Sequence, residues 1–330
     1  MTPLVFLWTL GAVAGTVATL TSWASLALPW AEGHGSPARR ADAAWLLGAA
    51  PAIATVAVTV ASAGPGLRAA VDRTVDHCEG HAHHAHLCWQ HGPSSVHVVA
   101  ALGAVWWVVV LARGARVMFD AARTARLARA LTALGSPDGP VVRVRTGAPL
   151  CHAVGHIRPR VLVSDAVWDA LPADEREAVL AHEGAHLRRR DPTADLLLAL
   201  LGVVAWPSSA RTWRERWRTA AEASADAEAA ARTDPGALAS ALVRVARLGL
   251  TEVPVGPGMA ATTHALEQRV TRLLASDVPH PVPARWFPLA GVVALAAALA
   301  AVVASDPVHH LVEDTVSAVT HMVASAYYSR

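Results

Sequence analysis

The chain contains no lysine, few cysteines and few charged residues, and these absences narrow what it can be. All 28 permanently basic side chains are arginine, a bias typical of GC-rich bacterial genes. Three cysteines, Cys78, Cys88 and Cys151, are too few for a disulfide scaffold. A net charge of +2 does not suggest direct nucleic-acid binding. With 16% charged and 53% hydrophobic residues, the chain is too apolar for an ordinary soluble enzyme.

Four apolar segments are long enough to cross a bilayer, and they cover residues 3–29, 43–63, 96–117 and 286–304. The N-terminus has no basic region of the kind that opens a signal peptide, so we expect the first span to stay in the membrane. Arginines gather after the first and third spans. The positive-inside rule then predicts an outside N-terminus and a cytoplasmic segment 118–285, in a multi-pass protein of the bacterial inner membrane. We expect the tail 305–330 to be an extracytoplasmic amphipathic segment.

A fifth apolar run, residues 194–206, is too short to cross. Thirteen helical residues reach only about 20 Å, against a hydrocarbon core of about 30 Å. A crossing would also place Glu222 on the opposite side of the bilayer from His182 and His186. Either this run is buried or dips into the membrane and returns, or Glu222 is not a ligand, and we expect the first.

A motif in the middle of the chain makes His182, His186 and Glu222 candidate ligands of one metal ion, which would require all three to lie on the same side of the bilayer. His182, Glu183 and His186 form H-E-x-x-H in a segment predicted to be helical, and residues four apart share a helix face. A catalytic zinc needs three protein ligands and one open position, and Glu222 is the natural third ligand. Neither motif supplies a fourth Cys or His, which a closed structural site would have. The alternative is a coincidental match on a solvated helix.

Further residues near the motif have expected roles. Asp226 shares a face with Glu222 and could accept the free N–H of a ligating histidine, although it could equally be a solvated acid, and Asp191 is a weaker candidate for the same role. The predicted mechanism is metal-assisted peptide hydrolysis with Glu183 as the base. His264 or Arg269 could stabilise the oxyanion, unless they belong to a surface amphipathic helix. Short predicted strands at 141–146 and 159–164 could offer an edge to an extended substrate.

The loop between the second and third spans, residues 64–95, is rich in histidine and cysteine. On the predicted orientation it faces an oxidising compartment, where a disulfide could join its two cysteines. The same cluster could instead bind a soft metal or sense pH. The residues in question are Cys78, Cys88, His81, His83, His84 and His86.

These motifs resemble the BlaR/MecR-type membrane metallopeptidases, the antirepressor proteases of bacteria. The resemblance covers nearly the whole chain and rests on residues 158–164, 178–183 and 186–191 and on the Glu222…Asp226 pair. It implies a mainly α, multi-pass membrane protein with four transmembrane helices and a cytoplasmic α+β, gluzincin-like zinc peptidase domain. It also implies one zinc ion on His182, His186 and Glu222, with Glu183 as the base. The substrate would be the chain itself, a cytoplasmic BlaI/MecI-like transcriptional repressor, or both, cut in response to an outside signal.

The chain also departs from that family's best-known members. About 25 residues follow the last predicted span, where those members carry a penicillin-binding sensor that needs a lysine in S-x-x-K, so direct β-lactam sensing is not expected. The family often has Cys at position 225, where this chain has Ala, as the HtpX/CAAX-protease type does. A membrane quality-control peptidase of that type is therefore the second alternative for the function. That type usually has two spans between the motifs, whereas 35 residues lie between His186 and Glu222 here. A non-proteolytic metal-binding signal transducer is the third alternative.

Overall fold

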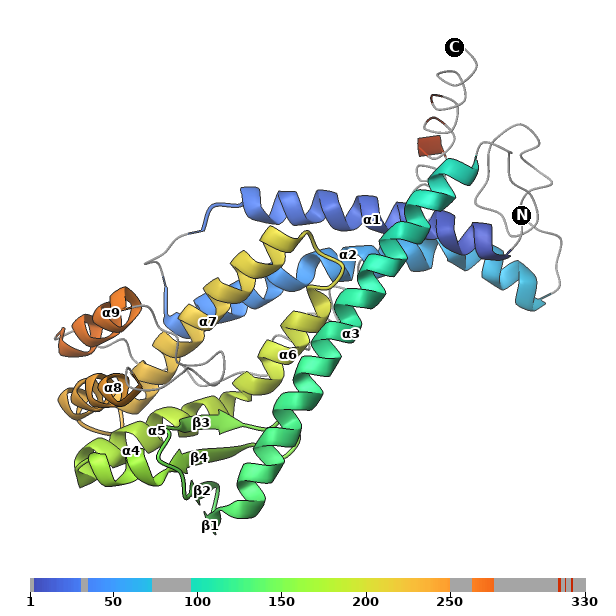
Figure 1. Ribbon diagram of the computed structural model, residues 1–330. Helices are drawn as coiled ribbons and strands as arrows, with labels where there is room; N and C mark the ends of the chain where they lie inside the picture. The colour runs from blue at the N-terminus through green and yellow to red at the C-terminus, as the bar shows by residue number, and fades with distance from the viewer. Residues whose placement is uncertain are drawn as a thin grey trace.

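The computed structural model describes residues 3–30, 35–72, 96–249 and 263–275, together with four single positions between 314 and 322. Within these residues the protein is mainly helical with one small sheet, as predicted (Figure 1). The predicted fourth span, almost all of the tail, and the cysteines and histidines of the 64–95 loop lie outside the described residues.

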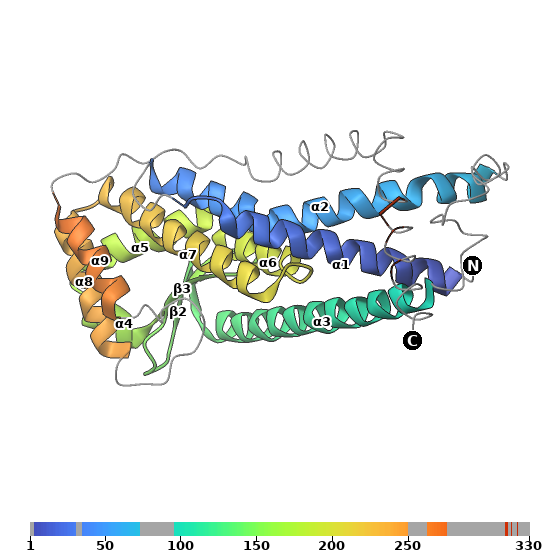
Figure 2. The ribbon, with the colours of Figure 1, turned by 90° about the horizontal axis from the view of Figure 1, so that it is seen from above.

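Three long helices form the N-terminal part of the chain: α1 (Pro3–Ala27), α2 (Pro37–Asp72) and α3 (Val96–Leu134). Each contains a stretch long and apolar enough to span a membrane, Leu7–Ala27, Pro37–Ser62 and Val98–Leu134. Helix α1 packs against both α2 and α3, and Figure 1 shows that α3 crosses it at a steep angle, which the view from above in Figure 2 does not reveal. Helices α1 and α3 approach so closely at Gly103 that a Cβ there would lie 1.7 Å from the carbonyl oxygen of Trp8, a contact only glycine allows.

Two of these helices extend beyond the predicted spans. Helix α2 continues through residues 64–72, which the sequence analysis assigned to a loop, and α3 continues from 117 to Leu134. The 39 residues of α3 cover about 58 Å, well over the bilayer core of about 30 Å. Helix α3 continues beyond its apolar stretch because the residues that follow are mainly Ala, Arg and Leu, which are strong helix formers. An apolar run marks where a helix can cross a membrane, not where it ends.

The sheet follows α3 and has four short strands, β1 (Ser136–Asp138), β2 (Val141–Val144), β3 (Cys151–Val154) and β4 (Arg160–Ser164). Their order is β1-β2-β4-β3, with β2 parallel to β4 and β3 antiparallel to β4. Alternate side chains of β4 face opposite sides of the sheet. Val161 and Val163 pack towards α5 and α8, and Leu162 packs with Val142 and Leu131 on the other side. Strand β3 is left at the edge.

The remaining described helices surround this sheet and lead away from it: α4 (Asp165–Ala170), α5 (Ala173–Arg189), α6 (Asp191–Leu201), α7 (Pro207–Ala230), α8 (Pro235–Gly249) and α9 (Thr263–Leu274). Helix α5 carries H-E-x-x-H. It begins after Pro172, has Asp174 and Glu175 in its first turn and ends at Arg190, whose φ of 54° breaks the helix. Pro192 then lies in the first turn of α6, where proline is well tolerated.

Helices α6 and α7 form a hairpin, and the short apolar run 194–206 supplies most of α6 and the turn that follows it. Helix α6 ends at Leu201, the chain turns, and α7 returns along α2 (Figure 1). The eleven residues of α6 span about 17 Å, too little to cross a bilayer. The run therefore returns instead of crossing, and α7 carries Glu222 back to the end of the molecule where α5 lies.

Candidate metal centre

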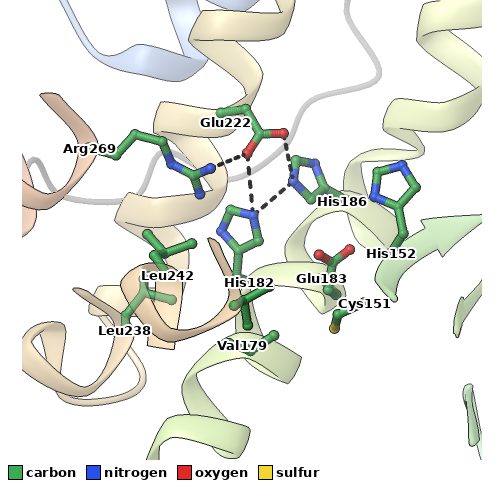
Figure 3. A pocket seen from close by; sticks show the side chains of 11 residues that line it. Cys151, His152, Val179, His182, Glu183, His186, Glu222, Leu238, Leu242 and Arg269 are labelled. Carbon is green, nitrogen blue, oxygen red and sulfur yellow. Dashed lines mark hydrogen bonds and ion pairs between the residues drawn. The ribbon is translucent and has the colours of Figure 1, made fainter. Parts of the chain in front are cut away.

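Helices α5 and α7 bring His182, His186 and Glu222 together (Figure 3). The Nε2 atoms of the two histidines lie 3.1 Å apart. The two carboxylate oxygens of Glu222 lie 3.5 Å from them, Oε2 from His182 and Oε1 from His186. Both imidazoles are buried. This is the one cluster of His, Cys, Asp and Glu with metal-ligand spacing in the described part of the chain.

These three separations suit a tetrahedral metal ion. Zinc bonds of about 2.0–2.1 Å to nitrogen or oxygen place neighbouring donors roughly 3.3 Å apart. The observed distances of 3.1, 3.5 and 3.5 Å lie on both sides of that value, with the two longer ones running to different oxygens of Glu222. One ligand atom from each of the three residues lies within 4.8 Å of the other two. Three protein donors also leave one position for water or substrate, as a catalytic site requires. His182, His186 and Glu222 therefore fit a catalytic zinc ion.

Each histidine has a carboxylate on its other ring nitrogen. Asp226, one turn after Glu222 on α7, places Oδ1 3.0 Å from Nδ1 of His182. Asp191, at the start of α6, places Oδ2 2.7 Å from Nδ1 of His186. Such carboxylates fix the orientation and tautomer of an imidazole and make its free nitrogen a better metal ligand. Asp226 and Asp191 therefore lie beside the ring nitrogens that would face away from a metal ion.

Arg269 reaches the same site from α9. Its guanidinium makes two parallel hydrogen bonds to Asp226, at 2.8 and 2.7 Å, and a third contact of 3.0 Å to Oε2 of Glu222. The side chain is buried, with 9% of its surface exposed. The arginine therefore holds two acids in place, a geometry different from that of a donor waiting for an oxyanion. The backbone of His264 lies in α9, and its side chain lies outside the described residues.

The charges of the cluster are strongly coupled. Burial alone would lower the pKa of His182, but Asp226 and Glu222 outweigh burial and raise that pKa to about 10. Burial likewise opposes ionisation of Asp226, yet Arg269 and His182 bring its pKa down to about 2. The pKa of Glu222 is also lowered, against burial, by His186, His182 and Arg269. Both acids are thus charged, and a divalent cation would take the place of protons held by the imidazoles.

Glu183 is buried beside the ligands, with one of its oxygens held by the sheet. Its Oε2 accepts a hydrogen bond of 2.7 Å from the backbone N–H of Ala153, on the edge strand β3. A cavity of about 30 Å³ adjoins it, lined by His152 from β3 and by Leu238 and Leu242 from α8, among others. That volume suffices for a water molecule.

Several residues of the site escaped the sequence analysis. The N–H of Ala153, the position of His152 beside the cavity and the apolar wall from α8 carry no local motif. The alternation of β3 was the available signal, since it places Cys151 and Ala153 on the face towards α5. Cys151 is a buried free thiol, and burial followed by the charge of Glu183 raises its pKa well above the usual value.

The fold and site together define a membrane-associated metallopeptidase. A family model described as BlaR1 peptidase M56 matches residues 51–273, about two thirds of the chain, from within α2 to the end of α9. The chain therefore belongs to that family, which confirms the resemblance found in the sequence. Searches of curated proteins and of solved structures returned no match. Membership brings with it a peptidase activity, a metal requirement and a protein substrate.

Proposed function

We propose that the protein is a zinc-dependent endopeptidase of the bacterial inner membrane. His182, His186 and Glu222 are its metal ligands and Glu183 is its catalytic base. One observation carries the proposal: three ligand atoms converge at metal-binding distances with Glu183 buried beside them. Three ligands with an adjacent carboxylate suit catalysis, whereas a purely structural zinc site would offer a fourth Cys or His. The non-proteolytic alternative is therefore disfavoured.

The chemistry divides between the ion and the chain. When bound, zinc polarises the scissile carbonyl and lowers the pKa of water. Glu183 accepts a proton from the attacking water and delivers it to the leaving amine, and the N–H of Ala153 orients that carboxylate. Asp226 and Asp191 orient the two histidines. Arg269 acts through Asp226 and Glu222, which leaves His264 as the proposed oxyanion donor.

The substrate is proposed to bind as an extended peptide along the edge strand β3. This strand pairs on one side with β4, and its other side adjoins Glu183. A peptide that adds to such an edge gains main-chain hydrogen bonds that do not depend on its sequence. With residues 118–285 in the cytoplasm, between three preceding spans and a fourth at 286–304, the substrate is the chain itself, a BlaI/MecI-like repressor, or both, cut in response to an outside signal.

The test uses the full-length chain purified in detergent. Wild type is compared with Glu183→Gln and with Glu177→Gln, an exposed carboxylate on the same helix. Bound zinc is measured, and cleavage of the chain and of any repressor encoded beside it is followed. We expect one zinc in all three and cleavage only by wild type and Glu177→Gln. General-base catalysis is worth about 10²–10⁴-fold in rate. Cleavage by Glu183→Gln at the wild-type rate, or no zinc in wild type, would refute the proposal.

A further inference from the structure

The tip of the α6–α7 hairpin is held by an arginine from α3. Residues 202–206 form the turn, and they are apolar or glycine. Arg113 donates from Nη1 to the carbonyl oxygen of Ala205 and from Nη2 to that of Gly202, each at 2.8 Å. Ala205 and Gly202 are both buried. Turn carbonyls packed among apolar helices need such partners, and the planar guanidinium fork can serve two acceptors at once.

The other two candidate spans also contact the hairpin through polar groups. On α1, Ser22 accepts a hydrogen bond of 3.0 Å from the backbone N–H of Trp206, and Ser25 accepts one of 3.0 Å from the indole of Trp213. On α2, the indole of Trp45 donates to the carbonyl oxygen of Ala194, in α6, at 3.1 Å. The hairpin is thus fixed to α1, α2 and α3 by directional bonds as well as by packing.

Both legs of the hairpin end in the metal centre. The first residue of α6 is Asp191, which contacts His186, and α7 carries Glu222 and Asp226. About 22 Å of continuous helix separates the start of α7 from Glu222. Trp217, on this stretch, is buried against α2. Because α7 is one continuous helix between its tip and Glu222, a shift at the tip can be passed along the helix to Glu222.

We propose that Arg113 is a positioning residue of the metal centre. Its two carbonyl bonds at the hairpin tip set the placement of Glu222 beside the histidines, although Arg113 touches none of the three ligands. This inference rests on the proposed function, because it takes His182, His186 and Glu222 to be the metal ligands. Lysine cannot replace Arg113, since a single ammonium does not reproduce the two-pronged geometry.

The variant Arg113→Lys keeps the positive charge and removes the fork. Arg116→Lys is the matched control, one turn further along α3 on an exposed side chain. Zinc affinity is measured on the full-length chain in detergent by competition with a chelator, alone and in a Glu222→Gln background. Thermal unfolding and the kcat and KM of cleavage are measured on the same samples.

We expect Arg113→Lys to weaken zinc binding about tenfold, at the lower end of what supporting residues of metal sites contribute. Arg116→Lys should leave it unchanged. This loss of zinc affinity should disappear in the Glu222→Gln background, because a residue that acts through Glu222 then has nothing left to position. If Arg113 and Glu222 acted independently, the two substitutions would instead weaken zinc binding by the product of their separate factors. In cleavage, kcat should fall with little change in KM. Ser22→Ala, a smaller change at the same hairpin tip, should show the same pattern more weakly and serves if Arg113→Lys folds poorly.

Two results would overturn the inference. One is wild-type zinc affinity in both Arg113→Lys and Ser22→Ala while Glu222→Gln loses zinc. The other is a loss of the same size in the Glu222→Gln background, which would mark Arg113 as merely structural. Failure of the underlying function looks different, because Glu222→Gln would then bind zinc as tightly as wild type.

Discussion

Replacing Asp191 by asparagine should weaken zinc binding by about 10- to 100-fold, or about 1.4–2.7 kcal/mol. The basis is the 2.7 Å contact between its carboxylate and Nδ1 of His186. A hydrogen bond between an imidazole and a carboxylate is stronger than one to a neutral acceptor, and it makes the opposite nitrogen a better ligand. Asparagine keeps the size and one acceptor oxygen but loses the charge, so the ring keeps its place while its basicity falls.

Asp195→Asn is the matched control for this substitution. Asp195 lies one turn further along the same helix, and its carboxylate accepts hydrogen bonds from Arg214 and Arg218 at 2.6–3.0 Å. It contacts neither histidine in these bonds. The change should therefore lower the unfolding temperature and weaken zinc binding much less than Asp191→Asn does. Arg189, which also bonds Asp191, keeps its contact to Ser224 in both variants.

The assay is a zinc titration of full-length protein in detergent near neutral pH, against a chelator of known affinity. Thermal unfolding of the same samples separates loss of fold from loss of ligand quality. An affinity equal to wild type in Asp191→Asn would refute the reasoning about His186. An equal loss in Asp195→Asn would show that any weakened contact in α6 disturbs the site, and that the carboxylate on the imidazole has no special part.

Two further substitutions test neighbouring contacts. Glu175→Gln should cost about 1–2 kcal/mol of stability, because Glu175 accepts hydrogen bonds from Arg244 and Ser240 that lower its pKa below the usual 4.5. Since that pKa is lower in the folded state, the difference from wild type should be full above pH 4.5 and vanish on acidification; a pH-independent difference in thermal unfolding would contradict this. Asp226→Asn should weaken zinc binding as Asp191→Asn does and lower stability further, by about 1–3 kcal/mol, because buried Arg269 loses its bidentate partner. Equal unfolding temperatures of Asp226→Asn and Asp191→Asn would argue against a stabilising pair between Arg269 and Asp226.

The parts of the centre that sequence could predict are those set by helical periodicity. His182 and His186 are four residues apart, as are Glu222 and Asp226, so each pair shares a helix face wherever the helices lie. A common metal ion then requires the two faces to meet. The same demand argued against a membrane crossing by residues 194–206, and in the structure α7 turns back after α6.

The parts that could not be predicted depend on contacts between distant segments. Glu183 meets Ala153 across 30 residues, and Arg269 meets Asp226 across 43. Arg113 is the clearest case, because arginines near the end of an apolar span are explained well enough by membrane orientation. Its bonds to residues 202 and 205 appear only once the hairpin is folded against α3. Helix ends were also missed, since α2 and α3 continue beyond their apolar runs.

The arrangement of the hairpin links the metal centre to the three candidate spans in both directions. If loss of the Arg113 contact weakens zinc binding by a given factor, thermodynamic linkage requires zinc to strengthen that contact by the same factor. H-E-x-x-H alone would not create this link, because both histidines lie on one helix that could hold them without the spans. The link arises because Asp191 and Glu222 come from the two legs of a hairpin whose tip bonds to α1 and α3. On the proposed role of Arg113, a displacement of α3 relative to α1 would act on Glu222 before it acts on the two histidines, which share helix α5.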